Sequence, residues 1–507
     1  MNRMSLLRYG LPGALILTAA SLQPAAAQLP SVLVPPPPAE VVQTSPPPAQ
    51  PAPAPPTSAP LPAPVQAAPP PPPPPPAPTM RAPVAVQAAP LQAPDLFSSE
   101  GSTPTGLPSD LWKGASLDLA RTVIPLLSAK PLSPAAGAFA LRVMSTSAPA
   151  PEGAGQDPDL AAARIGAVLS LGDALGARTM LEHTAGVRQN AALSQVAAET
   201  DLVLGREDEA CGLGDSLAAG KDGPYWRRLR VFCLIRAGDK PGAQLAYDLT
   251  TEQAKDETYK RLMGAAVAGA PAGDASLRNG LEYAVSRRLQ LDLTPALDKA
   301  WAPVVSAVAK DATAPAAVQA AAAALIAKRV NDLSRASTLN PAVRDATLAL
   351  ADNTRDPRAA EALAADGVAG GVESKGALAI YTAAGGPSDG RTRAAFALFD
   401  IGRSTGNQAR LLDMDGAAVG GPKGDAVLLA LWLMADAGEA GPGPVDRARI
   451  VGALRRAGLR DDARSYAIEG LLGLKPPMAA AAATAAPAAH PAPKKPVSKP
   501  VLRKRRK

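Results

Sequence analysis

Apolar side chains recur at helical spacing on both sides of short, glycine-containing turns. The clearest example runs from Tyr225 to Leu249, where apolar residues at 226, 229, 232 and 233 share one face of a helix. Gly238 follows at the point where a left-handed residue ends a helix, and Asp239 and Pro241 are typical of the first turn of another. The pattern therefore predicts a helix, a tight turn and a second helix.

The same turn recurs along the chain, and its first three copies are evenly spaced. Each copy has a glycine followed five positions later by an alanine. A period of about 33 residues is typical of stacked helical hairpins, because one hairpin buries its apolar face only against a neighbour. The alanine is expected where the two helices cross, since a larger side chain would force their axes apart. The pairs are Gly172 and Ala177, Gly205 and Ala210, Gly238 and Ala243, and Gly458 and Ala463.

These units resemble tetratricopeptide-type repeats, in which the first helix ends in a glycine and the second carries an aromatic residue four positions after a small one. Ala243 and Tyr247 match that pattern. Leu181, Gly214 and Ala467 replace the aromatic residue in the other copies, so the units are degenerate. The resemblance covers about residues 160–250 and 445–473. It implies an all-α fold, an α-solenoid of stacked helical hairpins, and it does not indicate a ligand.

Helical patterns continue on both sides of the repeats. An early pair is expected at 117–128 and 134–144, and the period becomes less regular after residue 250. Alternating β-branched and aromatic residues, the usual sign of strands, are scarce. Further helices are expected at 279–291, 294–310, 315–333, 341–352, 359–365, 375–383, 392–402 and 425–437.

The composition of the segment from 1 to 94 indicates export rather than a folded core. Arg3 and Arg8 precede a short apolar run that ends in three alanines at 25–27, which is the pattern of a Sec-type secretory signal peptide. Residues 30–94 hold 27 of the 56 prolines and two charged residues, so an extended, disordered spacer is expected. The expected location is the periplasm, and an uncleaved inner-membrane anchor is the alternative.

The excess positive charge lies at the end of the chain, from Lys494 onward. The chain has a net charge of +7, and without eight basic residues of this tail it holds 44 basic and 45 acidic residues. A disordered tail of this kind is expected to bind polyanions, namely peptidoglycan or anionic lipid, and export argues against nucleic acid. The eight residues are Lys494, Lys495, Lys499, Arg503, Lys504, Arg505, Arg506 and Lys507.

These boundaries give six expected regions. They are the signal peptide at 1–27, the Pro/Ala-rich spacer at 28–94, an entry helical hairpin and linker at 95–157, tetratricopeptide-like repeats at 158–250, a further helical-repeat region at 251–474, and the basic tail at 475–507. No later apolar stretch is long enough to span a membrane after signal cleavage.

The only two cysteines are Cys211 and Cys233, which the repeat pattern places on neighbouring helices. An exported chain meets an oxidising compartment, so a disulfide is expected. Closing a loop of about 20 residues would contribute about 3 kcal/mol. Two buried thiols are the alternative.

Candidate chemistry is sparse, because His183 is the only histidine before the tail. The string Gly214-Asp-Ser-Leu217 imitates the opening block of GDSL hydrolases, but no late Asp-x-x-His serves Ser216. The same stretch resembles a phosphate loop, with Asp222 where Ser or Thr would hold magnesium. The sequence therefore predicts no enzyme, no cofactor and no metal site.

The leading hypothesis is an exported scaffold that binds protein partners of the bacterial cell envelope. One alternative is a cell-wall or membrane-surface binding protein that acts through its spacer and basic tail. Another is a helical enzyme that cleaves glycans with carboxylates alone.

Overall fold

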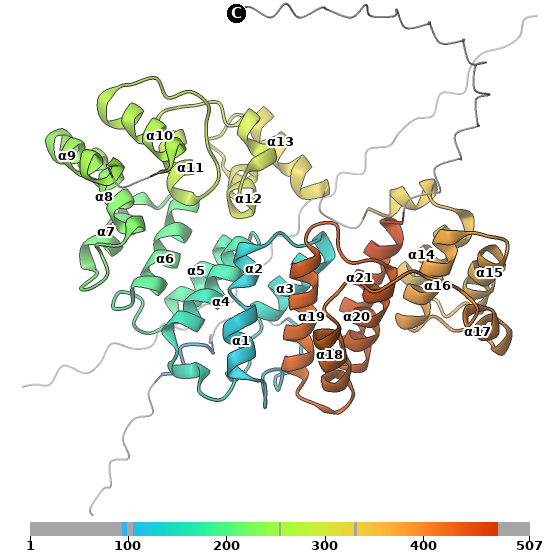
Figure 1. Cartoon of the computed structure of the whole chain (residues 1–507). Helices are drawn as coiled ribbons and strands as arrows, with labels where there is room; N and C mark the ends of the chain where they lie inside the picture. Colours follow the sequence, from blue (N-terminus) through green and yellow to red (C-terminus); the bar gives the residue numbers. More distant parts are fainter. Residues whose placement is uncertain (1–93, 99–104, 253–254, 329–331, 475–507) are drawn as a thin grey trace, which may run out of the picture. The chain divides into compact units, whose positions relative to one another are not determined.

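The computed structural model describes residues 94–98, 105–252, 255–328 and 332–474. Within these ranges every regular element is a helix, as predicted (Figure 1). The contacts divide the chain after Gln87, and all described residues belong to the second unit. The predicted signal peptide, the spacer before Pro94 and the basic tail lie outside the described residues.

The first helices include the predicted repeats and the entry segment before them. They are α1 (Leu117–Val123), α2 (Leu126–Ala129), α3 (Pro134–Met144), α4 (Pro158–Ser170), α5 (Ala174–Glu182), α6 (Ala191–Val203), α7 (Glu207–Ser216), α8 (Pro224–Ala237) and α9 (Lys240–Thr251).

The later helices extend from residue 257 to residue 472. They are α10 (Glu257–Ala268), α11 (Gly280–Arg288), α12 (Ala302–Lys310), α13 (Ala316–Lys328), α14 (Pro341–Ala351), α15 (Pro357–Val368), α16 (Val372–Ala383), α17 (Gly390–Phe396), α18 (Gln408–Gly420), α19 (Lys423–Ala437), α20 (Pro444–Arg456) and α21 (Arg460–Leu472). Short 3-10 helices lie at Ala154–Gln156, Thr294–Lys299 and Leu333–Thr338.

The four predicted turns have one geometry. Each glycine ends its first helix with a positive φ, 104° at Gly172, 73° at Gly205, 76° at Gly238 and 91° at Gly458. The amide of the next residue then donates to a carbonyl five positions back, for example Asp239 N to Leu234 O at 3.0 Å. This is the Schellman motif, which satisfies carbonyls that the helix end leaves free.

The residue after the glycine also starts the second helix in two of the four copies. The side chains of Asp173 and Asp239 accept hydrogen bonds from the amides of Gly176 and Gly242, at 2.8 and 2.9 Å. The alanine five positions after each glycine is buried, with at most 1% of its surface exposed. The pairs α4 and α5, α6 and α7, α8 and α9, and α20 and α21 are therefore close-packed hairpins, and these contact their neighbours as a solenoid requires.

The order in space departs from the order in sequence after α9. Helix α10 contacts α9 and α8, but α11 packs against α6, and α12 packs against α4 and α6. The entry helices lie between the repeat helices and the last helices of the chain, where α3 contacts both α4 and α21, and α1 contacts α19 (Figure 1). Ion pairs cross this junction, for example Lys130 to Asp436 at 2.6 Å and Arg142 to Asp462 at 3.1 Å.

A buried arginine fixes the first described segment onto α4. Arg164 is fully buried and donates to the carbonyls of Met144, Thr146 and Phe97, with its guanidinium 4.6 Å from the centre of the Phe97 ring. Burial lowers the pKa of Arg164 to about 10, which leaves it charged at neutral pH. The three carbonyls and the aromatic ring compensate for that charge in the interior.

Candidate functional site

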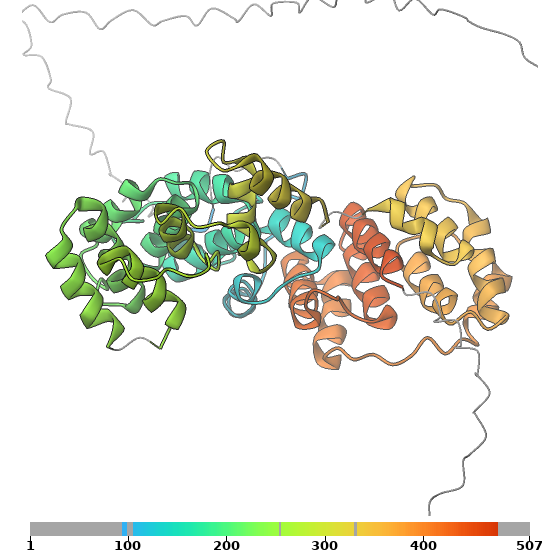
Figure 2. The same ribbon diagram turned by 90° about the horizontal axis from the view of Figure 1, so that it is seen from above.

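An open groove of about 710 Å³ lies between α16, α18 and α20 and is closed on one side by α17 and the segment that follows it. Figure 2 shows this segment, between α17 and α18, crossing from one helix to the other along the edge of the C-terminal helices. The groove has a larger volume than four other hollows, which lie among the described residues between 121 and 311.

Two contacts define the ends of the groove. At one end α16 and α20 are close, because a Cβ on Gly376 would lie 3.0 Å from the ring of Pro444. At the other end the Arg455 Nε donates to the carbonyl of Ala383 at 3.0 Å. The two helices therefore run side by side along the groove, and they form its floor.

The floor is made of small residues. Ala379 and Ala383 lie one turn apart on α16, and Ala448 and Gly452 lie one turn apart on α20. Small side chains in the lining of a hollow leave room in it for the side chains of another molecule.

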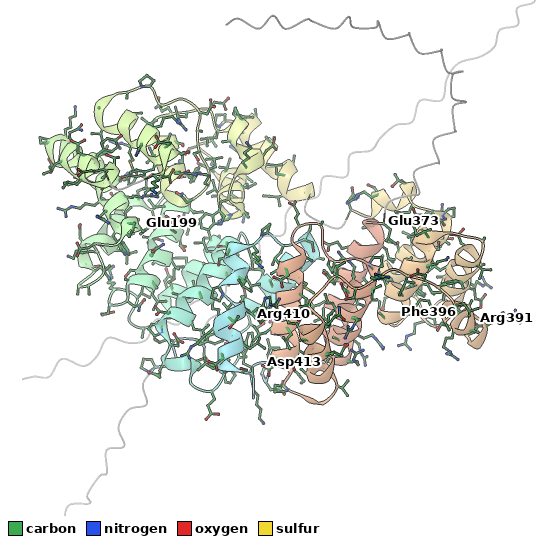
Figure 3. The ribbon with its side chains drawn as sticks, viewed as in Figure 1. Glu199, Glu373, Arg391, Phe396, Arg410 and Asp413 are labelled. Atoms are coloured by element: carbon green, nitrogen blue, oxygen red, sulfur yellow. A yellow bond between two sulfur atoms is a disulfide. The ribbon has the colours of Figure 1, made fainter. Side chains whose placement is uncertain are left out.

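The walls are apolar. Phe396, Ile401 and Val419 line the groove from α17, from the crossing segment and from α18. Figure 3 shows Phe396 on the inner side of α17 and Arg391 on its outer side. Phe396 also packs edge-to-face against Phe399, with ring centres 6.3 Å apart, and Val419 is 76% exposed. Covering an exposed apolar side chain with another apolar surface removes both from water, which stabilises the complex.

The rim is basic. Asp415 on α18 pairs with both Arg449 and Arg456 on α20, each at 2.6 Å. Arg455 lines the same rim and has no carboxylate partner among the described ion pairs. The three guanidinium groups and the single carboxylate leave this rim with a net charge of +2.

Exposed apolar side chains are frequent in the stretch of chain that forms the groove, and one of them, Val419, lines it. Ten large apolar side chains are exposed among the described residues, and five of them lie between 368 and 419. They are Val368, Val372, Leu398, Leu412 and Val419.

A second, smaller cleft of about 330 Å³ lies beside the turns at Gly172 and Gly205. Its polar groups are used within the fold, because Arg287 lies over the Tyr283 ring and pairs with Asp311 at 3.8 Å. Burial raises the pKa of Tyr283 to about 12. The cleft is therefore a packed junction of α11 and α12 with the repeat turns.

One carboxylate has an unusual pKa. Burial raises the pKa of Glu199 on α6 to about 7, although Gly280 N donates to its Oε2 at 2.7 Å, and the nearby charge of Glu282 raises it further. Glu282 is itself buried and bound by Ser276 and Arg278. Neither glutamate lines a cavity described above. Both lie where α6 packs against α11, and Glu199 is labelled in Figure 3.

The structure brings the two cysteines together as predicted. Cys211 on α7 and Cys233 on α8 form a disulfide with their Cα atoms 5.6 Å apart. This bond joins two successive hairpins of the stack. The eight basic tail residues lie outside the described residues.

Two of the arginines on α8, Arg228 and Arg236, make ion pairs within the fold. Arg236 pairs with Glu207 and Asp208 on α7. Arg228 pairs with Asp256 at 3.3 Å and lies over the Tyr259 ring.

Ser216 lies at the end of α7, where its hydroxyl donates to the carbonyl of Leu213. Trp112 and Trp226 are buried in the core, and Arg410 lies 3.6 Å from the centre of the partly buried Trp432 ring.

Neither α18 nor the groove was predicted from the sequence. The available signal was the pair of apolar residues Leu412 and Val419, which are seven positions apart and prove to be exposed.

Among the described residues there is no cluster of three or more side chains suited to a metal ion, and none of the described helices is both long and apolar enough to cross a bilayer. Comparisons with protein-family models, curated proteins and solved structures found no match to this chain.

Proposed function

We propose that the protein is an exported helical scaffold that binds segments of other proteins and positions them in the bacterial cell envelope. The single observation that carries this proposal is the open apolar groove on α16, α18 and α20, with the exposed side chain of Val419 in its wall. Grooves between stacked helices are a common way for solenoids to hold protein segments. We also propose that the repeats at 158–250 are tetratricopeptide-like.

Two further features support the export part of the proposal. The segment from 1 to 27 has the pattern of a secretory signal peptide, and the disulfide between Cys211 and Cys233 is typical of oxidising compartments. The long proline-rich segment that follows the signal would act as a spacer.

The test is chemical crosslinking in cells that express the tagged full-length chain, followed by capture under denaturing conditions and mass spectrometry. The expected result is a small, reproducible set of envelope proteins. Capture of no protein above an untagged control would overturn the proposal. Fractionation of the same cells tests export, since a chain that stays in the cytoplasm contradicts it.

One alternative has a specific observation in its favour, namely the eight basic residues between Lys494 and Lys507. A tail of this kind binds cell wall or anionic membrane without a partner protein. A chain truncated before Lys494 separates the two functions. The scaffold keeps its crosslinked partners after truncation, whereas a wall-binding protein no longer sediments with purified walls.

A further inference from the structure

We propose that the groove between α16 and α20 binds an acidic amphipathic helix of a partner protein, with apolar side chains on one face and carboxylates beside them. This inference rests on the proposed scaffold function and names the chemistry of its partner. It follows from the length of the groove, the shape of its floor and the charge of its rim.

The length of the groove fits a short helix. The residues of α20 that line it run from Val445 to Arg456. At 1.5 Å per residue these positions span about 16 Å, or about three helical turns. A partner helix of three turns presents apolar side chains at positions i, i+3, i+4 and i+7 to such a groove.

The floor and walls fit large apolar side chains. Alanine and glycine at the floor leave space between the helices, and Phe396, Ile401 and Val419 offer apolar walls. Gly452 contributes to that space, because a Cβ there would meet only the end of the Arg456 side chain at 3.2 Å. Leucine or phenylalanine side chains of a partner would bury the exposed surface of Val419.

The rim selects the charge of the partner. With a net charge of +2, it attracts carboxylates, and arginine binds them with two parallel hydrogen bonds. Arg455 is exposed, and among the hydrogen bonds of the described residues its side chain makes only the one from Nε to Ala383, which leaves its Nη groups available. The same charge disfavours the basic tail of this chain as the occupant, because the tail carries eight positive groups.

The first arm of the test uses two labelled synthetic helices and fluorescence anisotropy with the full chain. Both peptides have leucines at i, i+3, i+4 and i+7; one has glutamates beside them and the other has lysines. We expect the acidic peptide to bind at least about 10-fold more tightly at low salt. Equal affinities, or no binding of either peptide, would overturn the inference.

Two groove variants and two matched controls locate the binding. Val419→Glu and Arg455→Glu change exposed residues of the groove, and each is expected to weaken binding of the acidic peptide by about 10-fold or more. Leu245→Glu on α9 and Arg391→Glu on the outer side of α17 change exposed residues outside its lining and are expected to leave the affinity unchanged. Thermal unfolding of all four variants verifies that they fold.

The second arm separates this inference from the proposed function. A photocrosslinking amino acid replaces Val419 in the chain expressed in cells, and Leu245 on α9 in the control. The expected product at 419 is a partner segment with the acidic amphipathic pattern. A product with the chain's own tail or with a second copy of the chain contradicts the inference. If partners crosslink through other surfaces and survive Val419→Glu, the scaffold function stands and the groove assignment is wrong.

Discussion

Glu469 on α21 caps the start of α3, although it lies 336 positions after Ser133 in the chain. Its Oε2 accepts a hydrogen bond from the Ser133 hydroxyl at 2.6 Å, and its Oε1 accepts one from the amide of Ala135 at 2.7 Å. Arg447 Nη1 lies 3.1 Å from the same carboxylate. One side chain of the last helix therefore satisfies free groups at the N-terminus of an early helix.

Replacement of this carboxylate tests the junction. Glu469→Gln keeps the shape of the side chain but removes its charge, and it leaves the buried Arg447 without an ion-pair partner. We expect the free energy of unfolding to fall by about 2 kcal/mol, measured by urea denaturation. The control is Glu439→Gln in an exposed turn, which is expected to change stability by less than about 0.5 kcal/mol. Equal effects of the two variants would contradict a role for Glu469 in the junction.

A pair of glycines tests the turn geometry. Gly238→Ala introduces no collision, yet it forces an alanine to a φ of 76°, so we expect a loss of about 1 kcal/mol. Gly212→Ala in α7 also meets no neighbour, but it lies inside a helix and is expected to stabilise by about 0.5 to 1 kcal/mol. Thermal unfolding of both variants measures the difference in stability. If both substitutions shift the unfolding temperature in the same direction, Gly238 does not hold the left-handed turn conformation described above.

Removal of the disulfide tests the clip between α7 and α8. Cys211→Ala combined with Cys233→Ala opens a link between residues 22 positions apart, and the expected loss of stability is about 3 kcal/mol. Dithiothreitol is expected to lower the unfolding temperature of the native chain and to leave that of the double variant unchanged. If dithiothreitol leaves the unfolding temperature of the native chain unchanged, the disulfide contributes no stability.

Glu199 predicts a pH dependence. Its carboxyl group has a pKa of about 7 in the folded protein, whereas an unfolded glutamate loses its proton near 4.5. The folded state therefore binds more protons between these values, and the free energy of unfolding falls as the pH rises from 4.5 to 7. Asp201 on the same helix has a pKa that burial raises in the same direction, so the native chain alone does not isolate Glu199.

The variant Glu199→Gln isolates this contribution. Each unit of pKa shift corresponds to about 1.4 kcal/mol, so the native chain is expected to lose on the order of 3 kcal/mol more than the variant across this pH range. Urea denaturation at pH 4.5, 6 and 7.5 measures the difference. Parallel pH profiles for the two chains would show that Glu199 is not protonated in the fold.

The repeats could be predicted because their signals are local. A glycine at a helix end and an alanine at a crossing depend on the few residues around them, and all four copies have the expected geometry. The same turn also occurs where no such signal exists, since Gln290 and Asn353 adopt positive φ values of 55° and 54°. Pro125 and Pro303 explain two differences, because helices expected at 117–128 and 294–310 are each divided near a proline.

The groove and the junction could not be predicted because they depend on residues far apart in the chain. Helix α18 buries Leu411, Met414 and Ala418 at helical spacing, but the apolar residues Leu412 and Val419 on its other face obscure that stripe in the sequence. The expected helix at 392–402 ends at Phe396, and the residues after it instead form the crossing segment beside the groove. Nothing local in α3 indicates that its cap comes from α21.

The position of α1 to α3 has a consequence for how this polypeptide is made. The ribosome produces these three helices early, but their neighbours α19 and α21 emerge only after nearly all the other helices have been synthesised. Trp112 is fully buried beside Gly424 in the folded protein, so it stays exposed until those late helices have been synthesised and cover it. Unfinished chains would carry an uncovered tryptophan, which makes them natural targets for chaperones and proteases.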